Sequence, residues 1–249
     1  MQPMLQLAKK IYKLGKNIIL SPFVIYDYWS FKQLDKNPRF ELGIRDFFPQ
    51  IFDKTKLTGF DRHYVYHTAW AARKVAQIAP AKHVDIASSL YFPGLVSAFI
   101  PVDFYDYRPA PLHLSGLATE HADLTQLHFE SNSIPSLSCL HTIEHIGLGR
   151  YGDPIDPEGD IKACAELSRV LAPGGSLLFV TPVGKKAIIQ FNAHRIYTYE
   201  KVLALFPTLK LEEFSFVPEH GTDGVHEHAN PIELQNETYA CGLFWFKKV

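Results

Sequence analysis

The sequence predicts an α/β protein with a doubly wound, mostly parallel seven-stranded sheet. Short apolar segments of strand length alternate with amphipathic segments of helix length, a pattern typical of this fold class. A helix expected at 158–171 leads through Pro173-Gly174-Gly175 into a buried strand at 177–180, as in a β-α-β crossover. The segments 209–217 and 238–247 have no helix-length segment between them, so they predict an antiparallel pair.

The remaining elements follow from the same patterns. Residues 61–79 predict a helix because Tyr64, Trp70 and Val75 recur at helical spacing and Pro80 ends the pattern. Residues 199–206 predict another helix, with Thr198 as its N-cap. A short helix is expected at 92–99. The other strands are expected at 83–88, 102–107, 117–124 and 136–142.

Residues 1–60 predict an N-terminal region that is separate from a Rossmann-like domain at 61–249. Residues 21–60 are rich in aromatic residues and interrupted by prolines, so we expect a cap of short helices over the sheet. Residues 1–20 form a basic amphipathic segment. This segment predicts a surface helix docked on the protein or, alternatively, a weak membrane-surface contact, because lysines beside apolar residues suit anionic headgroups.

Composition narrows the functional classes. The 249 residues carry a net charge of −1, so no overall field attracts nucleic acid. Cys139, Cys164 and Cys241 lack CxxC spacing, which predicts a reducing compartment and no cysteine-based metal site. No apolar run reaches membrane-spanning length, and lysines interrupt the place where a signal peptide would have its apolar core. We therefore expect a cytoplasmic protein that does not bind nucleic acid.

The most informative segment is Leu140-His141-Thr142-Ile143-Glu144-His145-Ile146, at the end of the predicted fourth strand. It places a polar loop at the carboxyl end of a strand that begins a β-α-β unit. Ligands of open α/β sheets bind in the crevice outside such strand ends. The segment therefore marks the expected functional site.

The block from His141 to Asp153, with the surrounding segments 83–184 and 191–197 and the stretch from Cys241 to Phe244, resembles an uncharacterised methyltransferase-like family. That family is related to the class I S-adenosylmethionine (SAM) dependent methyltransferases. The resemblance implies a parallel sheet finished by an antiparallel hairpin, and SAM as the cofactor. It also implies a role in glycan biosynthesis, and hence a sugar hydroxyl as one candidate acceptor.

The resemblance further implies which residues hold SAM. Asp85 stands at the acidic end of the first strand, but an Ala-Ser-Ser turn replaces the glycines expected after it. Either Asp103 or Asp106 would accept the ribose hydroxyls, and we favour Asp106 because it is nearer the strand end. An acid after the third strand would meet the adenine amino group. The predicted cofactor-binding residues are Asp85, Ala87, Ser88, Ser89, Asp106, Tyr107, Asp123, Leu124 and His141.

Catalytic residues are expected among the histidines of the same edge. Methyl transfer mainly requires alignment of the acceptor, but a hydroxyl acceptor also needs a base to take its proton. Histidine is the side chain most easily tuned for this near neutrality. We favour His145 as the base, with His141 or His194 as alternatives and Glu144 as a partner. A purely structural role is the competing interpretation for each histidine.

Two loops are expected to contact the acceptor. The glycine-rich loop offers Arg150 and Tyr151, and Arg150 either holds an anionic group bidentately or pairs with Asp153 or Asp156. Asn192 and Arg195 follow the fifth strand. A third loop contains His220, His226 and His228 beside Glu219, Asp223 and Glu227; its spacing favours a solvated loop over a metal site, and no metal is expected.

The sequence thus predicts a SAM-dependent methyltransferase that methylates an oxygen of a small molecule or a sugar. The alternative is a non-catalytic binding or scaffold protein that kept the fold and lost the cofactor. The Ala-Ser-Ser turn is the feature that favours this alternative. The pattern leaves the acceptor and the oligomeric state open.

Overall fold

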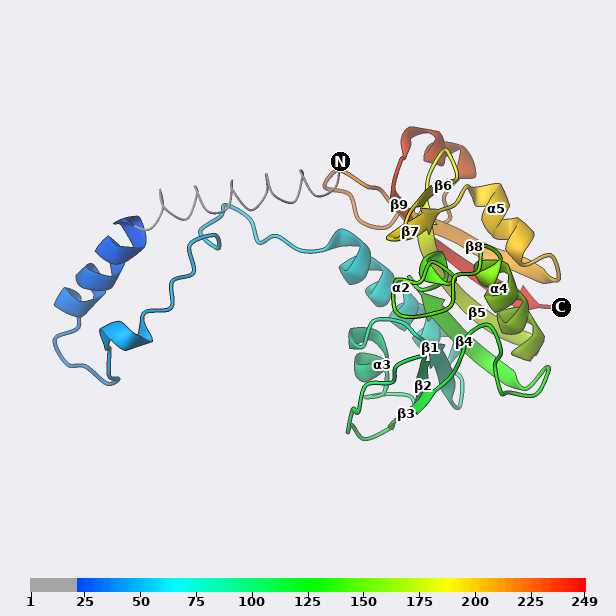
Figure 1. Cartoon of the computed structure of the whole chain (residues 1–249), viewed down its shortest axis with the longest axis horizontal. Helices are drawn as coiled ribbons and strands as arrows, with labels where there is room; N and C mark the ends of the chain where they lie inside the picture. The colour runs from blue at the N-terminus through cyan, green and yellow to red at the C-terminus, as the bar shows by residue number, and fades with distance from the viewer. Residues whose placement is uncertain (1–21) are drawn as a thin grey trace. The chain divides into compact units, whose positions relative to one another are not determined.

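The computed structural model describes residues 22–249, and the chain divides into two compact units, Met1–Phe60 and Asp61–Val249. In the first unit, residues 22–34 are helical and a 3-10 helix, η1, spans Ile44–Asp46 (Figure 1). The basic segment 1–20 lies outside the described residues. Coverage of the sheet by the first unit stays a prediction.

The second unit contains a seven-stranded sheet in the order β3-β2-β1-β4-β5-β9-β8 (Figure 1). β9 (Ala240–Lys248) is antiparallel to both of its neighbours, β5 and β8 (Leu209–Val217). The doubly wound, mostly parallel seven-stranded fold is therefore confirmed. The five strands on the parallel side are β1 (His83–Ile86), β2 (Val102–Asp106), β3 (Leu117–His121), β4 (Ile134–Leu140) and β5 (Leu171–Val183).

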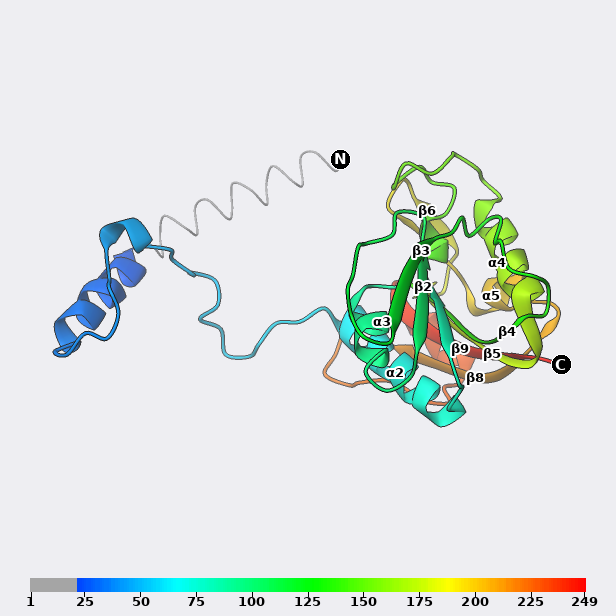
Figure 2. The same ribbon diagram turned by 90° about the horizontal axis from the view of Figure 1, so that it is seen from below.

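Helices cover both faces of the sheet (Figure 2). On one face, Trp70 and Phe92 pack against Leu140 and Leu178 in a buried cluster. On the other face, Leu167 belongs to a larger cluster. Because both faces are buried, the central strands are buried along most of their length, including the polar side chains of His83, Asp85 and Ser138. The covering helices are α2 (Arg62–Ile78) and α3 (Tyr91–Val96) on the first face, and α4 (Gly159–Val170) and α5 (Tyr199–Leu205) on the second.

The helix ends follow from local chemistry. The Asp61 carboxylate accepts a hydrogen bond from the Tyr64 N–H over 3.1 Å and thereby caps α2. The helix ends where Ala79 adopts a left-handed conformation, directly before Pro80. The predicted N-cap of α5 is confirmed, since the Thr198 hydroxyl accepts from the Lys201 N–H over 3.3 Å.

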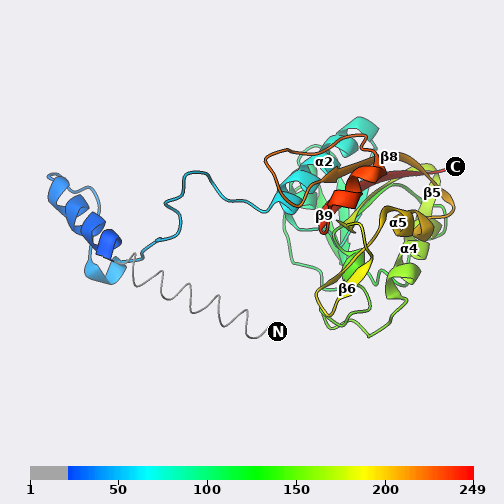
Figure 3. The same cartoon turned by 90° about the horizontal axis from the view of Figure 1, so that it is seen from above.

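Three features differ from the predicted elements. β5 begins at Leu171 rather than after the Pro-Gly-Gly turn, because Leu171 already pairs with Ile134 before the register shifts. Two short strands, β6 (Ile188–Gln190) and β7 (His194–Ile196), form a separate sheet where a loop was expected. Three residues are too few to show strand alternation. The β8–β9 connection carries a 3-10 helix, η3 (Pro231–Asn236) (Figure 3). Within residues 22–249, no helix is both long and apolar enough to cross a membrane.

Candidate active site

A cavity of about 380 Å³ lies at the carboxyl ends of β1, β2 and β4. Its walls come from the turn after β1, the end of β2, the segments after β3 and β4, and Tyr64 of α2. This is the edge where ligands of open α/β sheets bind. The predicted site residues that line it are Ala87, Ser88, Ser89, Asp106, Tyr107, Asp123, Leu124, His141, His145 and Tyr151.

Asp85 supports the turn after β1 and does not line the cavity. It is completely buried, and its Oδ1 accepts hydrogen bonds from the hydroxyls of Ser88, over 2.6 Å, and Ser138. The Ser88 hydroxyl in turn accepts from the Leu140 N–H over 3.1 Å. Burial raises the pKa of Asp85 to about 7, against the lowering effect of these serine hydrogen bonds. Asp85 therefore supports the turn, while its Oδ2 is buried with no partner among the described residues, and its role as a cofactor ligand stays a prediction.

The turn after β1 contains a positive backbone φ, which is usual for glycine, at a residue that is not glycine. Ala87 has a φ of 58°, in the left-handed region that favours glycine. Its N–H donates to the Tyr105 carbonyl over 2.7 Å, and its carbonyl accepts from the Thr142 hydroxyl over 2.8 Å. The Ser89 hydroxyl is buried and has no partner among the described residues. Neighbouring strands therefore hold the turn, and Ser89 keeps a free hydroxyl at the cavity wall.

Two carboxylates face the cavity from the strands beyond β1. The Asp106 Oδ1 accepts from the Arg108 N–H over 2.7 Å, and no described residue donates to its other oxygen. Asp123 accepts from both the backbone and the hydroxyl of Thr125, over 2.8 and 2.7 Å. The alternative ribose ligand, Asp103, pairs instead with Lys82 over 2.6 Å and does not line the cavity. The geometry therefore favours Asp106 over Asp103.

His141 and Glu144 form a buried pair on the opposite wall. The His141 Nδ1 lies 2.7 Å from the Glu144 carboxylate, and its Nε2 lies 3.3 Å from the Cys241 sulfur. Burial opposes a charge on this ring, but Cys241 and Glu144 together raise the pKa of His141 above its usual value. The pKa of Glu144 is lowered, because His141 outweighs the effect of burial. Both nitrogens of His141 are engaged, so the structure does not support His141 as the general base.

Of the two histidines that line the cavity, His145 has a ring nitrogen without a hydrogen bond to any described residue. Its Nδ1 lies 2.7 Å from the Ala193 carbonyl, which also accepts from Arg150 over 2.8 Å. Its Nε2 has no hydrogen bond within the described chain and lies 3.8 Å from the Glu144 carboxylate. Burial lowers the pKa of His145, with Arg150 and His141 adding to this and Glu144 opposing it. The ring is therefore neutral, and its two Nδ1 contacts favour different tautomers: the Ala193 carbonyl only accepts, whereas the Arg150 guanidinium, 3.2 Å from Nδ1, only donates.

Of the residues predicted to contact the acceptor, some line the cavity and others do not. Tyr151 lines the cavity, with its ring edge-on to His145 at 5.5 Å. Arg150 lies behind His145 rather than on the cavity wall, and it pairs with neither predicted aspartate. Asn192 is exposed and away from the cavity.

Arg195 and His194 do not line the cavity. Arg195 is buried and donates to the Ile146 carbonyl over 2.6 Å, with Asp160 at 3.5 Å. It therefore fastens the loop after β4 and does not face an acceptor, because a buried guanidinium needs such partners. The His194 ring lies 6.4 Å from His145 and does not line the cavity.

The glycine-rich loop is closed upon itself. Gly147 has a φ of 78°, and a Cβ added there would lie 2.0 Å from the Asp156 carbonyl oxygen. Its N–H donates to the Asp153 carboxylate over 2.8 Å. The glycine is thus required by close approach of the loop to its own backbone, rather than by approach to a ligand.

Sequence reasoning missed the contribution of α2. This helix stacks Tyr64 on His141, with ring centroids 5.6 Å apart, and places His63 and His67 at 5.3 and 4.9 Å from the same ring. His63 and His67 are four residues apart and therefore share a helix face. The four-residue spacing of His63 and His67 is the sequence signal for this pair. The apolar pattern that predicts the helix does not include them.

The histidines of the β8–β9 connection do not converge. His226 lies 3.3 Å from Glu233, whereas His228 lies 3.8 Å from Glu213. Each imidazole has its own carboxylate partner.

The sheet order and the cavity at its edge define a protein of the class I methyltransferase fold. Within this class, the chain belongs to the family described as "Caenorhabditis protein of unknown function, DUF268", whose model matches residues 113–237. No curated protein matches the chain.

Solved structures agree with the fold. The N-methyltransferase NodS from Bradyrhizobium japonicum WM9, in complex with S-adenosylhomocysteine, has a TM-score of 0.52 at 14% identity, over 74% of this chain and 86% of NodS. The 1,6-didemethyltoxoflavin-N1-methyltransferase from Burkholderia thailandensis has a TM-score of 0.51 at 12% identity, covering 74% and 78%. The YcgJ protein from Bacillus subtilis has a TM-score of 0.53 at 12% identity, covering 74% and 99%.

Proposed function

We propose that this protein is a SAM-dependent methyltransferase that methylates a hydroxyl group of a small molecule or a sugar. The observation that carries the proposal is the division of the cavity into two walls. Asp106 and Asp123 offer carboxylates on one wall, and neutral His145 offers a nitrogen on the other. NodS and the Burkholderia enzyme, which share the fold, were both solved with S-adenosylhomocysteine bound.

The residues of the first wall fit the parts of SAM. The Asp106 carboxylate suits ribose hydroxyls, since it has an oxygen without a protein donor. The Asp123 carboxylate suits the adenine amino group. The unpartnered Ser89 hydroxyl suits the carboxylate of the methionine tail. When bound, SAM supplies a methyl group on a sulfonium, which is already a good leaving group.

The second wall handles the proton of the acceptor. The lone pair on the His145 Nε2 takes the hydroxyl proton as the oxygen becomes nucleophilic. The mechanism uses the tautomer in which Nδ1 donates its proton to the Ala193 carbonyl, the shorter of its two contacts at 2.7 Å against 3.2 Å to Arg150. The Glu144 carboxylate, 3.8 Å away, stabilises the imidazolium that forms. Tyr64 and Tyr151 complete the wall with aromatic surface that orients the acceptor and limits water.

Calorimetric titration of the full chain with SAM and with S-adenosylhomocysteine tests cofactor binding. We expect saturable binding of both, at protein concentrations on the order of 100 μM. A folded protein that gives no heat with either compound would contradict the proposal. That outcome would favour the scaffold alternative, for which the glycine-free turn at Ala87 is the supporting observation.

The role of His145 is tested separately. A panel of hydroxyl compounds and sugars is offered with SAM, and release of S-adenosylhomocysteine is measured. With an acceptor found, His145→Gln is expected to lower turnover by about 100-fold or more while S-adenosylhomocysteine still binds. His194→Gln is the matched control, because His194 lies outside the cavity. Equal turnover by wild type and His145→Gln would remove His145 from the mechanism.

A further inference from the structure

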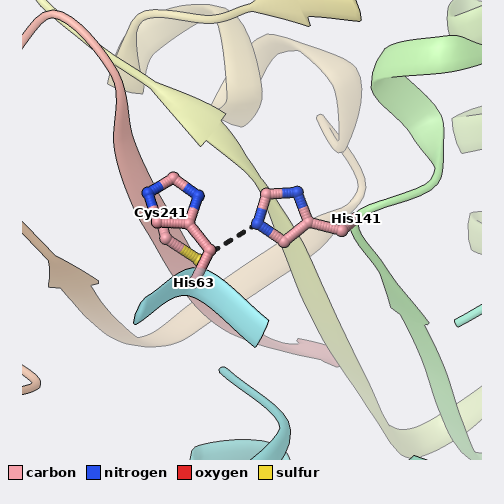
Figure 4. Close-up of side chains that lie close together, drawn as sticks. All are labelled: His63, His141 and Cys241. Carbon is pink, nitrogen blue, oxygen red and sulfur yellow. Dashed lines mark hydrogen bonds between the residues drawn. The ribbon is translucent and has the colours of Figure 1, made fainter. Parts of the chain in front are cut away.

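Three potential metal ligands converge behind the cavity. The ligand atoms of His63, His141 and Cys241 all lie within 4.8 Å of one another (Figure 4). They come from α2, from the end of β4 and from β9. His141 and Cys241 are buried, and His63 is nearly so. The cluster therefore joins three elements that are far apart in the sequence.

The donor set and spacing suit a tetrahedral metal ion. Zinc binds thiolate sulfur at about 2.3 Å and imidazole nitrogen at about 2.0 Å, so neighbouring ligand atoms in a tetrahedral site are about 3.3 to 3.6 Å apart. The Cys241 sulfur and the His141 Nε2 are already 3.3 Å apart. The ligand atom of His63 would have to move only slightly closer to the other two, which lie within 4.8 Å of it, to complete a three-ligand site. A mixed thiolate and imidazole set selects zinc over magnesium or calcium.

The outer shell of the cluster has the arrangement found around metal-bound histidines. The His141 Nδ1 lies 2.7 Å from the buried Glu144 carboxylate. Such a carboxylate orients the ring and directs the other nitrogen, here Nε2, at the metal. Glu144 also lies within 3.5 Å of the Thr181 hydroxyl, which holds it in place.

His67 provides an independent observation. Its side chain is completely buried, and neither ring nitrogen has a hydrogen-bond partner among the described residues. Buried polar groups without partners are rare in folded proteins and call for an explanation. Its ring lies 4.9 Å from that of His141, on the same helix face as His63. A fourth ligand is what the cluster lacks.

We propose that His63, His141 and Cys241 bind one zinc ion, with His67 as the fourth ligand. On binding, the Cys241 sulfur and the His141 Nε2 release their protons to solvent, and the thiolate and the imidazole nitrogens donate their lone pairs. His141 keeps its Nδ1 proton on Glu144. The site does not depend on the proposed methyl transfer, and it is a cysteine-containing metal site of a kind that the cysteine spacing does not predict.

Metal titration of the full chain tests the proposal. The purified protein is treated with a chelator, then titrated with Co²⁺ and afterwards with Zn²⁺. We expect one Co²⁺ per chain, with the charge-transfer absorption of a cysteine–cobalt bond, and loss of that absorption when Zn²⁺ replaces it. Failure to bind either ion stoichiometrically, with native circular dichroism retained, would overturn the proposal.

Two matched cysteine variants identify the ligand. Cys241→Ser should abolish the cysteine–cobalt absorption and weaken Zn²⁺ binding by at least about tenfold. Cys139→Ser should change neither, because this buried cysteine of β4 lies outside the cluster. His67→Gln should weaken Zn²⁺ binding while the cysteine–cobalt absorption persists. Unchanged absorption in Cys241→Ser would overturn the assignment without any assumption about SAM.

Discussion

The two walls of the cavity are built in opposite ways. On the carboxylate wall, the side chains of Asp106 and Asp123 accept hydrogen bonds only from residues two positions along the chain. On the histidine wall, Glu144 and His141 are buried and bond to each other, and His141 also contacts Cys241, 100 residues away along the chain. The first wall has hydrogen-bonding capacity left for a ligand. The second uses most of its polar groups to hold itself together, and His145 is the exception.

This contrast separates binding from support within one site. A change on the carboxylate wall should alter affinity with little effect on folding. A change on the histidine wall should alter stability first. The following predictions test this division, in order of decreasing expected effect.

Glu144→Gln should lower the free energy of unfolding by about 3 kcal/mol, because it breaks a buried pair. This loss is at the lower end of the range for a broken buried ion pair, because His141 can lose its proton and become neutral. Urea denaturation at neutral pH measures the change. Glu212→Gln is the control, because Glu212 pairs with Lys210 at the surface and should leave stability unchanged. Equal losses in both variants would show that the His141–Glu144 pair has no special role.

Asp85→Asn should remove a pH dependence. The pKa of Asp85 is about 7 in the folded chain and near 3.8 in a model peptide, so between these values the folded state keeps a proton that the unfolded state has lost. Wild-type stability from this group is therefore present at low pH and is lost as the pH rises toward 7. Relative to wild type, the variant should gain about 2 kcal/mol between pH 5 and pH 8.

The measurement for Asp85→Asn is denaturation of both proteins across that pH range. The other titratable groups near this carboxyl are Asp106, Cys139 and His83. His83 is linked to it through the hydroxyl of Ser138. They are present in both proteins, so their effects cancel in the difference. A difference that does not vary with pH would show that Asp85 is ionised in the folded chain.

Asp106→Asn should weaken S-adenosylhomocysteine binding by about tenfold, or about 1.4 kcal/mol, because the amide loses the charge that strengthens ribose hydrogen bonds. Calorimetry measures the affinity. Asp103→Asn is the matched control, since Asp103 pairs with Lys82 outside the cavity. Weaker binding in the control alone would reverse the assignment of the ribose ligand.

Ala87→Gly should stabilise the protein by about 0.5 to 1 kcal/mol, because glycine adopts the positive φ without steric cost. Ala165→Gly, at an exposed position of α4 with ordinary helical geometry, should instead destabilise it by about 1 kcal/mol. Urea denaturation compares the two. A loss of stability in Ala87→Gly would mean that the methyl group has packing that outweighs the strain.

The same division explains what the sequence could and could not predict. The carboxylate wall follows from strand ends and short-range spacing, so Asp106 and Asp123 could be located in advance. The histidine wall depends on contacts between α2, β4 and β9, which no local pattern encodes. The contribution of His63 and His67 could not be predicted, because the pattern that predicts a helix consists of its apolar positions. Arg195 was predicted to face the acceptor, but the sequence alone does not distinguish a buried arginine that bonds to the backbone from one that faces a ligand.

The position of β9 has a consequence for the order of folding. This strand is the latest in the sequence of those in the sheet, yet it lies between β5 and β8, and β8 pairs with no other strand. β8 can therefore join the sheet only after β9 has been synthesised, and Cys241 arrives at His141 in the same step. Such long-range pairing is slow compared with local helix formation. During synthesis, the His141–Glu144 pair can therefore form before β9, whereas the contact of His141 with Cys241 must wait until β9 has left the ribosome.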